Sequence, residues 1–287
     1  MSCFFVTDIH GSIDRYRKLF QAMREEKPQA LFLGGDLMPN LAYARESLDF
    51  GHEDFLNDYL ANQFRRLKEE LGEEYPSVFV ILGNDDGMYP EWSVLAAAGE
   101  NIWKYLHNRR LKVENYRFYG YSYIPPSPFQ LKDWERYDVS RYVDVGAVSP
   151  EQGQRSVPVA ENEVKYSTIK RDLEILSRGE EDFSHAVFLF HAPPYDTGLD
   201  RAALDGKMVD HVPLDVHVGS IAIRRFIEAK QPLLTLHGHI HESAQITGVW
   251  KEKLGETWMI NAAHNGDELS LVKFELEAPG EAERVLL

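Results

Sequence analysis

Five short apolar runs, each followed by residue types that bind metal ions, constrain this chain more than any other feature. The runs span residues 4–6, 31–33, 78–82, 186–190 and 233–236. Apolar runs of this length are typical of buried strands. In an open α/β sheet the carboxyl ends of the strands form the crevice where ligands bind, so residues far apart in sequence can meet there. We therefore expect an α/β fold with a ligand site at the strand exits.

The residues at these exits supply carboxylates, one amide and several imidazoles. They occur as Asp8-Ile9-His10, Gly35-Asp36, Gly83-Asn84-Asp85-Asp86, His191 and Gly238-His239-Ile240-His241. Such oxygen and nitrogen donors together suit divalent ions such as Mn, Fe, Ni and Zn. A lone Gly-Asp turn or a lone buried histidine is commonly structural. The ordered occurrence of all five groups at strand ends favours a metal site.

These motifs and their order resemble those of the calcineurin-like metallophosphoesterases. That family carries D-x-H, G-D, G-N-H-(D/E), a lone H, and G-H-x-H, and the resemblance here covers residues 4–241. One position departs, because Asp85 stands where many members have histidine. The stretch 219–243 also resembles a poorly characterised prokaryotic branch of the family.

The resemblance implies a four-layer α/β/β/α sandwich of two mixed β-sheets flanked by helices. It also implies two divalent metal ions, with a bridging hydroxide that attacks phosphorus in line. Asp36 would bridge the two ions. The remaining ligands would divide into one set for each ion, namely Asp8, His10 and His241, and Asn84, His191 and His239.

The role of Asp85 stays open at this point. The family histidine helps to protonate the leaving group or to steady the phosphate, whereas an aspartate beside two cations should be ionised and a poor acid. Asp85 could point away and accept a hydrogen bond from a ligand histidine, or the substrate could have a good leaving group. Alternatively His217 or His264 could be the acid, although both could be ordinary surface residues. We expect His237 to have only a supporting role.

Composition and charge narrow the choice of partner. The chain has 287 residues, a net charge of −15 and a single cysteine, Cys3. Strong negative charge disfavours nucleic acid, whose binding depends on cationic side chains. Two divalent ions, less two carboxylates and a hydroxide, leave about +1 at the site itself, which suits a small phosphorylated substrate. No apolar run is long enough for a membrane span, and no signal pattern is recognised. We therefore expect a cytoplasmic protein. The sequence does not indicate its oligomeric state, and a homodimer is possible.

We expect a single domain over residues 1–287, with insertions near 39–75 and 130–166. The apolar spacing predicts helices over about 13–27, 53–71, 92–106, 168–177 and 220–229, the first one capped by Ser12 and stopped by Pro28. Strands are predicted within 111–124 and 258–275. Segments 132–165 and 192–218 read as loops, the former as a lid or insertion, and the carboxyl terminus as a frayed acidic tail.

The leading hypothesis is hydrolysis of a small phosphodiester or nucleotide. A serine/threonine phosphatase is disfavoured, because Gly35-Asp36 continues into Leu37-Met38 and not into the basic Asp-Arg-Gly of those enzymes. A nuclease of the same superfamily and a catalytically weak metal-binding scaffold are the alternatives, and Asp85 favours the scaffold. A further group of aromatic residues could stack on a nucleobase or simply pack in a sheet, namely Tyr119, Tyr121, Tyr123 and Phe129.

Overall fold

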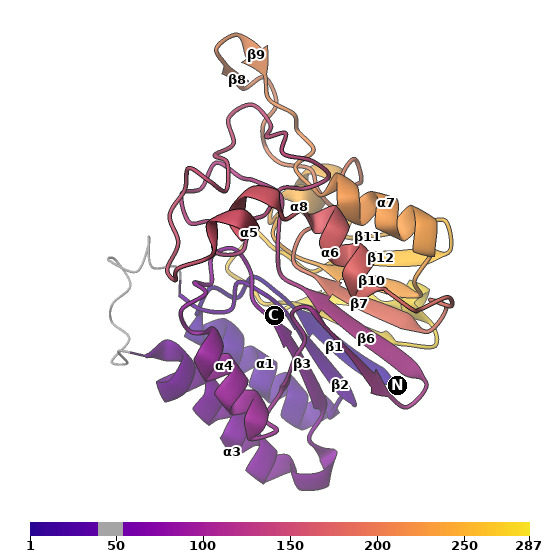
Figure 1. Cartoon of the computed structure of the whole chain (residues 1–287). Helices are drawn as coiled ribbons and strands as arrows, with labels where there is room; N and C mark the ends of the chain where they lie inside the picture. Colours follow the sequence, from indigo (N-terminus) through magenta and orange to yellow (C-terminus); the bar gives the residue numbers. More distant parts are fainter. Residues whose placement is uncertain (40–53) are drawn as a thin grey trace.

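Two six-stranded sheets packed face to face form the centre of the molecule, and helices cover their outer faces (Figure 1). The computed structural model describes residues 1–39 and 54–287. The strand orders are β14-β13-β1-β2-β3-β4 and β11-β12-β10-β7-β6-β5. Both sheets mix parallel and antiparallel pairs, so the predicted sandwich of two mixed sheets flanked by helices is confirmed.

The first sheet contains three of the five apolar runs as its central parallel strands. Its β1, β2, β3 and β4 are parallel, β13 pairs antiparallel with β1, and β14 pairs antiparallel with β13. The strand bounds are β1 Ser2–Val6, β2 Ala30–Gly34, β3 Ser77–Ile81, β4 Lys104–Tyr105, β13 Ser270–Glu275 and β14 Glu283–Leu286.

The second sheet contains the other two runs. Its β6, β7, β10 and β12 are parallel, and the edge strands β5 and β11 are antiparallel to their neighbours. The bounds are β5 Arg109–Val113, β6 Tyr116–Tyr121, β7 Ala186–Phe190, β10 Leu234–His237, β11 Lys251–Leu254 and β12 Thr257–Asn261.

Both faces of the central strands are buried, which explains why their sequences are continuously apolar. Phe32 of β2 stacks on Phe79 of β3 with ring centroids 5.1 Å apart, and Phe79 stacks on Phe118 of the other sheet at 4.5 Å. The neighbouring residues Leu31 and Leu33 face the opposite way and belong to the apolar layer beneath the helices. The central strands are thereby packed between two apolar layers.

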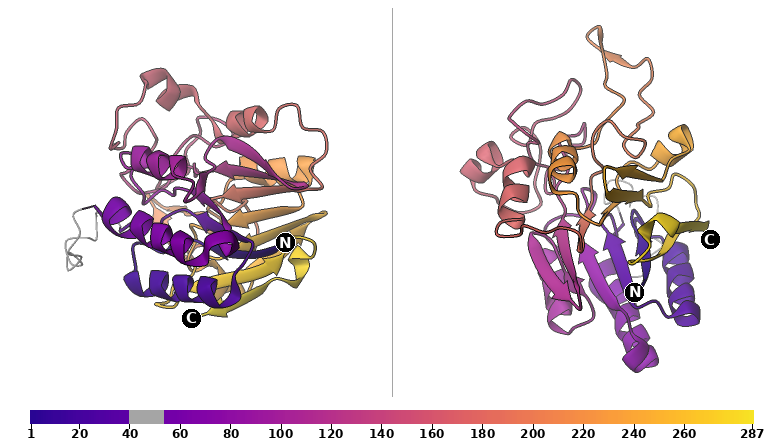
Figure 2. Two further views of the ribbon diagram at one scale, coloured as in Figure 1. Left: turned by 90° about the horizontal axis from the view of Figure 1, so that it is seen from below. Right: turned by 90° about the vertical axis from the view of Figure 1, so that its right-hand side faces the viewer.

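The helices flank the two sheets as two outer layers (Figures 1 and 2). Ser12 caps the first helix by accepting a hydrogen bond from the Arg15 amide, and that helix ends before Pro28, as predicted. The helices beside the first sheet are α1 Ile13–Glu26, α3 Asn62–Leu71 and α4 Glu91–Gly99. Those beside the second are α6 Ile169–Leu176 and α7 Ile221–Lys230, and two short ones are α5 Glu161–Tyr166 and α8 Ser243–Thr247.

Three sequence-based predictions of secondary structure need correction. The helix expected over 53–71 is π-helical at first, in η1 Phe55–Ala61, and is followed by a 3-10 turn, η2 Gly72–Glu74. The helix expected to reach residue 106 ends at Gly99, because Lys104–Tyr105 pairs with β3 as strand β4. The expected frayed tail instead contains η3 Pro279–Glu281 and β14, which pairs with β13.

The predicted insertion at 39–75 can be compared with the structure only in part, because its residues 40–53 lie outside the described part of the chain. The expected loop 192–218 contains a projecting two-stranded hairpin, β8 Met208–Val209 and β9 Val212–Pro213 (Figure 1).

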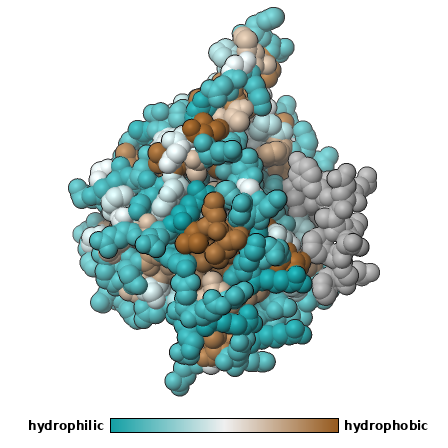
Figure 3. All heavy atoms as spheres, turned by 180° about the vertical axis from the view of Figure 1, so that it is seen from behind, coloured by the Kyte–Doolittle hydropathy of each residue, from teal (hydrophilic) through white to brown (hydrophobic). Residues whose placement is uncertain are grey.

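Within the described ranges, no helix has the length and apolar character needed to cross a membrane. The face drawn in Figure 3 is mainly hydrophilic, with a compact apolar patch near its middle.

Segment 132–165 has little regular structure, but buried polar contacts anchor it. The side chains of Lys132 and Glu135 are both fully buried and form an ion pair. Ser127 donates hydrogen bonds to Glu135 through its amide and its hydroxyl. Whether this segment moves as a lid stays a prediction.

Candidate metal centre

The five strand exits converge at one edge of the sandwich, where two groups of metal-binding side chains assemble. In the first group His241 Nε2 lies 3.1 Å from Asp8 Oδ1 and 3.2 Å from His10 Nε2. Asp8 and His10 follow β1, whereas His241 follows β10 of the other sheet. One ligand atom from each of these residues lies within 4.8 Å of the other two, close enough to bind one ion.

The second group is formed by Asp36, His191 and His239, whose ligand atoms also lie within 4.8 Å of one another. His191 Nε2 is 3.3 Å from Asp36 Oδ2 and 3.0 Å from Asn84 Oδ1. The amide oxygen of Asn84 therefore points at the same space as the histidine and the carboxylate. All seven predicted ligands thus lie in or against these two groups.

Four of the seven predicted ligands have a backbone conformation that side chains rarely adopt. Asp8, His10, Asp36 and His239 have φ angles of 55°, 50°, 51° and 72°. Non-glycine residues with positive φ are uncommon, and their clustering is typical of functional sites. Backbone hydrogen bonds hold these turns, from the Asp8 amide to the carbonyl of Gly35 and from the His10 amide to that of Asp36.

Further hydrogen bonds orient the ligands. His191 Nδ1 lies 2.8 Å from the carbonyl of Gly34, and donation to that carbonyl leaves Nε2 as the nitrogen that can bind a metal. The amide of His239 donates to both carboxylate oxygens of Asp8 at 3.1 Å. The amide of Asp85 donates to Asp36 Oδ1 at 2.7 Å. The site is therefore organised by the backbone as well as by side chains.

Asp86, the residue after Asp85, connects two loops of the site. Its fully buried carboxylate accepts hydrogen bonds from the backbone amides of Leu37, Met38 and Gly83. The loop after β3 is thereby held against the loop that carries Asp36. No side chain fits at Gly83 either, since a methyl group there would overlap Asp36 Oδ1.

The electrostatics of the site favour bound cations. Burial raises the pKa of Asp8 and of Asp36, but the neighbouring histidines together lower both pKa values, His241 contributing most for Asp8 and His191 for Asp36. Burial works against protonation of His191, yet Asp36 raises its pKa to about 10. Buried carboxylates and imidazoles are costly unless opposite charges accompany them. Their oxygen and nitrogen donors fit divalent transition ions.

The other predicted site residues have different surroundings. His217 Nδ1 lies 2.7 Å from Asp200 Oδ1, and His264 Nε2 lies 3.1 Å from Glu268 Oε2. Neither histidine belongs to the potential metal-binding groups found in residues 1–39 and 54–287. Their catalytic roles stay predictions.

The expectations for the remaining histidine and for the aromatic residues have different outcomes. His237 is buried, and its ring nitrogens face the Ala192 carbonyl and the Thr235 hydroxyl, which fits a supporting role. Three of the aromatic residues, Tyr119, Tyr121 and Tyr123, are buried in the core, so the idea that they stack on a nucleobase is wrong. Phe129 is exposed.

The sequence reasoning missed Arg15. Its guanidinium donates to the carbonyl of Asp8 at 2.9 Å and to the carbonyls of Gly266 and Asp267 in the loop after β12. A basic residue in the first turn of a helix beside the Asp8 loop was visible in the sequence, but nothing there indicated its backbone partners.

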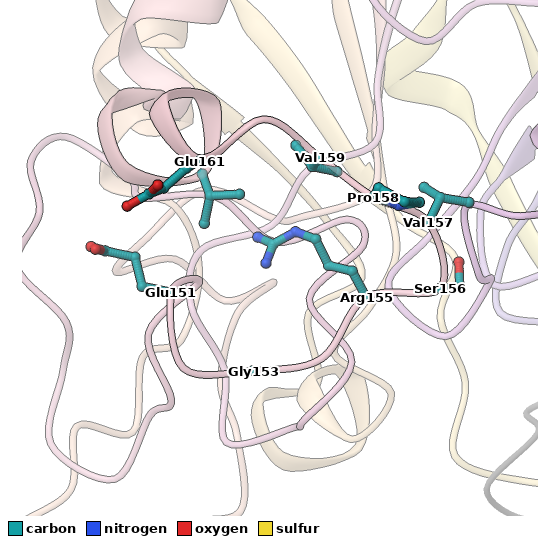
Figure 4. A pocket seen from close by; sticks show the side chains of 9 residues that line it. Glu151, Gly153, Arg155, Ser156, Val157, Pro158, Val159 and Glu161 are labelled. Carbon is teal, nitrogen blue, oxygen red and sulfur yellow. The ribbon is translucent and has the colours of Figure 1, made fainter.

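A surface hollow of about 670 Å³ lies in the anchored segment (Figure 4). The side chain of Arg155 points into it, towards the space between Glu151 and Glu161. Ser156 at its border accepts hydrogen bonds from the amides of Met88 and Tyr89. Met88 is three residues beyond Asp85, so their Cα atoms are at most about 11 Å apart.

Comparison with known proteins agrees with this fold. The sequence profile of the calcineurin-like phosphoesterases matches residues 1–243, so the chain belongs to that family. Membership supports a hydrolase that acts on phosphate esters. The comparison with curated proteins gave no match.

Among solved structures, TT1561 of Thermus thermophilus is similar over 99% of this chain and 98% of its own, with 17% identity and a TM-score of 0.56. That likeness supports the fold. A dimetal phosphatase from Danio rerio has a TM-score of 0.48, with 12% identity over 95% of this chain and 92% of its own. An archaeal phosphodiesterase has a TM-score of 0.44, with 9% identity over 100% of both chains. The last two likenesses are too weak to bear on this chain's function.

Proposed function

We propose that this protein hydrolyses a phosphate ester with the help of two divalent metal ions. The observation that supports this most strongly is the position of Asp36. It belongs to one potential metal-binding group with His191 and His239, and to another with His10 and Asp85. A carboxylate shared in this way can contact two ions at once.

The chain's own residues have separable tasks in this proposal. Asp8, His10 and His241 hold one ion, and Asn84, His191 and His239 hold the other. When bound, the ions would contact the phosphoryl oxygens and activate water for in-line attack on phosphorus. Mn, Fe, Ni and Zn all suit the donors.

We propose a small phosphodiester or a nucleotide as the substrate. The net charge of −15 disfavours a long polyanion. The hollow beside the loop after β3 offers room for the part of the ester that is remote from phosphorus, and Arg155 could contact an anionic or planar group there. A nuclease and a catalytically weak metal-binding scaffold remain the alternatives.

Metal add-back tests this function. Metal-stripped protein is assayed on bis-p-nitrophenyl phosphate and p-nitrophenyl phosphate, with Mn, Fe(II), Ni and Zn supplied separately. We expect metal-restored turnover that Asp36→Ala abolishes and that His185→Ala, at an exposed histidine outside the site, leaves unchanged. Two bound ions per chain with no turnover on any ester would favour the scaffold.

A further inference from the structure

Asp85 is turned towards the proposed metal ligands. Its backbone amide donates to Asp36 Oδ1 at 2.7 Å. Its carboxylate Oδ1 accepts a hydrogen bond from Asn84 Nδ2 at 3.1 Å, and Oδ2 lies 3.7 Å from His10 Nδ1. The side chain is about a quarter exposed, at 24%, so it borders both the ligands and the solvent side from which a substrate arrives.

The first role considered for Asp85, in which it points away and accepts a hydrogen bond from a ligand histidine, fits this geometry poorly. A side chain pointing away from the site is inconsistent with a carboxylate whose ligand atom lies within 4.8 Å of those of His10 and Asp36. Asp85 is also a poor hydrogen-bond acceptor for His10, because the 3.7 Å between Asp85 Oδ2 and His10 Nδ1 exceeds the usual N–H···O distance of about 2.7–3.2 Å. The carboxylate and the imidazole are close enough for one cation to contact both.

We propose that Asp85 is a third carboxylate of the metal centre and that its charge makes the site select phosphodiesters over phosphomonoesters. The selectivity rests on the proposed function. The Asp85 carboxylate makes the net charge of the metal-loaded centre one unit lower than in a family member that has a neutral histidine at this position. A diester carries one negative charge at phosphate, whereas a monoester, whose second pKa is about 6, carries nearly two at about pH 8. The loss of one positive unit therefore weakens the attraction for the monoester more.

The first test measures metal binding without any turnover. Titration calorimetry with Mn²⁺ compares the metal-free wild type with Asp85→Asn, which removes the charge but keeps the size. The matched control is Asp210→Asn in the exposed hairpin turn, where asparagine tolerates the positive φ. We expect Asp85→Asn to weaken Mn²⁺ binding at one site by at least roughly tenfold. Loss of a residue that only hydrogen-bonds a metal ligand already weakens metal binding by about 10–100-fold. Thermal melting of the metal-free variants checks that each is folded.

The second test measures charge selection on metal-loaded protein at pH 8, again without turnover. Inorganic phosphate serves as the dianion and dimethyl phosphate as the monoanion. We expect Asp85→Asn and Asp85→His to tighten phosphate binding by about tenfold, and dimethyl phosphate binding by clearly less. In a turnover assay, the ratio of kcat/KM for the diester to that for the monoester should fall in the same variants.

The outcomes separate this proposal from the proposed function. Unchanged Mn²⁺ affinity in a folded Asp85→Asn protein would overturn the role of Asp85 as a ligand. Equal changes for the two phosphates would overturn the charge selection. Wild-type protein that binds metal and both phosphates but hydrolyses no ester would overturn the proposed function while leaving the role of Asp85 in place.

Discussion

The imidazole Nε2 of His191 lies 3.0 Å from the amide Oδ1 of Asn84. His191 follows β7 of the second sheet, and Asn84 follows β3 of the first. This contact therefore joins the two halves of the sandwich at the proposed metal centre. The site depends on the packing between the sheets, and changes that loosen either strand exit should weaken metal binding as well as stability.

Asp86 provides a test of this dependence. Replacing it by alanine removes the acceptor of three buried backbone amides, those of Leu37, Met38 and Gly83. Because each unsatisfied buried donor costs about 1–3 kcal/mol, we expect Asp86→Ala to lower the free energy of unfolding by about 3 kcal/mol or more. Urea denaturation of metal-free protein measures this loss.

The same variant should also bind metal more weakly, since the loops that carry Asp36 and Asn84 lose their connection. Asp86→Asn keeps one oxygen acceptor and should lie between wild type and Asp86→Ala in both measurements. Wild-type stability in Asp86→Ala would show that these amides find other acceptors, and the proposed connection between the two loops would then be wrong.

Lys132 and Glu135 allow a test of how segment 132–165 is anchored. Both side chains are fully buried, and Lys132 Nζ also donates to the Ser127 carbonyl at 2.8 Å. Removing one partner leaves an uncompensated buried charge, so Lys132→Met should destabilise the protein by about 3–5 kcal/mol. The double variant Lys132→Met/Glu135→Leu should lose clearly less, because an apolar pair replaces the whole ion pair.

Chemical denaturation of the two variants measures this difference. If the double variant is as unstable as the single one, shape and hydrogen bonding dominate over the unpaired charge. Faster proteolysis within the segment in Lys132→Met than in wild type would show that the ion pair restrains the segment's motion.

Much of the site was predictable because local sequence determines it. The apolar runs predict strands, and residues that follow parallel strands of the same sheet meet at one edge of that sheet. Asp8 and His241 follow strands of different sheets and are 233 positions apart, so their placement in one ligand set depended on the resemblance to the family. The direction of the Asp85 side chain was not predictable, since it depends on its amide bonding to Asp36.

Two of the incorrect predictions have a common physical cause, which is pairing between distant segments. The apolar spacing of Leu95, Ile102 and Leu106 predicts a helix through residues 104 and 105, but these two residues form a strand beside β3. The acidic tail reads as frayed, yet β14 pairs with β13 through Leu271 and Val285. Local propensity cannot report such pairings because their hydrogen-bond partners lie elsewhere in the chain.

Arg155 provides a test of the hollow as part of the substrate site. Its side chain enters the hollow, where Pro150 accepts a hydrogen bond from it at 2.7 Å. If the remote part of the substrate lies there, Arg155→Ala should raise KM by about tenfold for nucleotide substrates, with kcat nearly unchanged, because it removes binding common to the ground and transition states. The small ester bis-p-nitrophenyl phosphate should be affected less.

The control for this measurement is Arg171→Ala, which removes an exposed arginine from the surface of α6. Equal effects of both variants would indicate a general charge effect. No effect of Arg155→Ala on any phosphate ester would place the substrate elsewhere.

His107 should make the stability of the protein sensitive to acid. The ring is buried, and Nδ1 accepts a hydrogen bond from the Ser122 amide at 3.0 Å. Burial, with smaller contributions from Arg136 and Arg109, lowers the pKa of His107 to about 3. Between about pH 6.5 and 3 the unfolded chain therefore binds a proton at this residue that the folded chain does not. Its contribution to the free energy of unfolding is complete above pH 6.5 and falls by up to about 1.4 kcal/mol for each pH unit below it.

Urea denaturation at a series of pH values from 7.5 to 4.5 measures this loss in wild type and in His107→Asn, whose side-chain oxygen can still accept from Ser122. The variant should start less stable, because the smaller side chain leaves a cavity, but its stability should fall less steeply below about pH 6.5. His237, also buried with its pKa lowered to about 4, contributes acid sensitivity in both proteins and cancels in the comparison. Parallel pH profiles for the two proteins would show that His107 is protonated to the same extent in the folded and unfolded states, contrary to its burial.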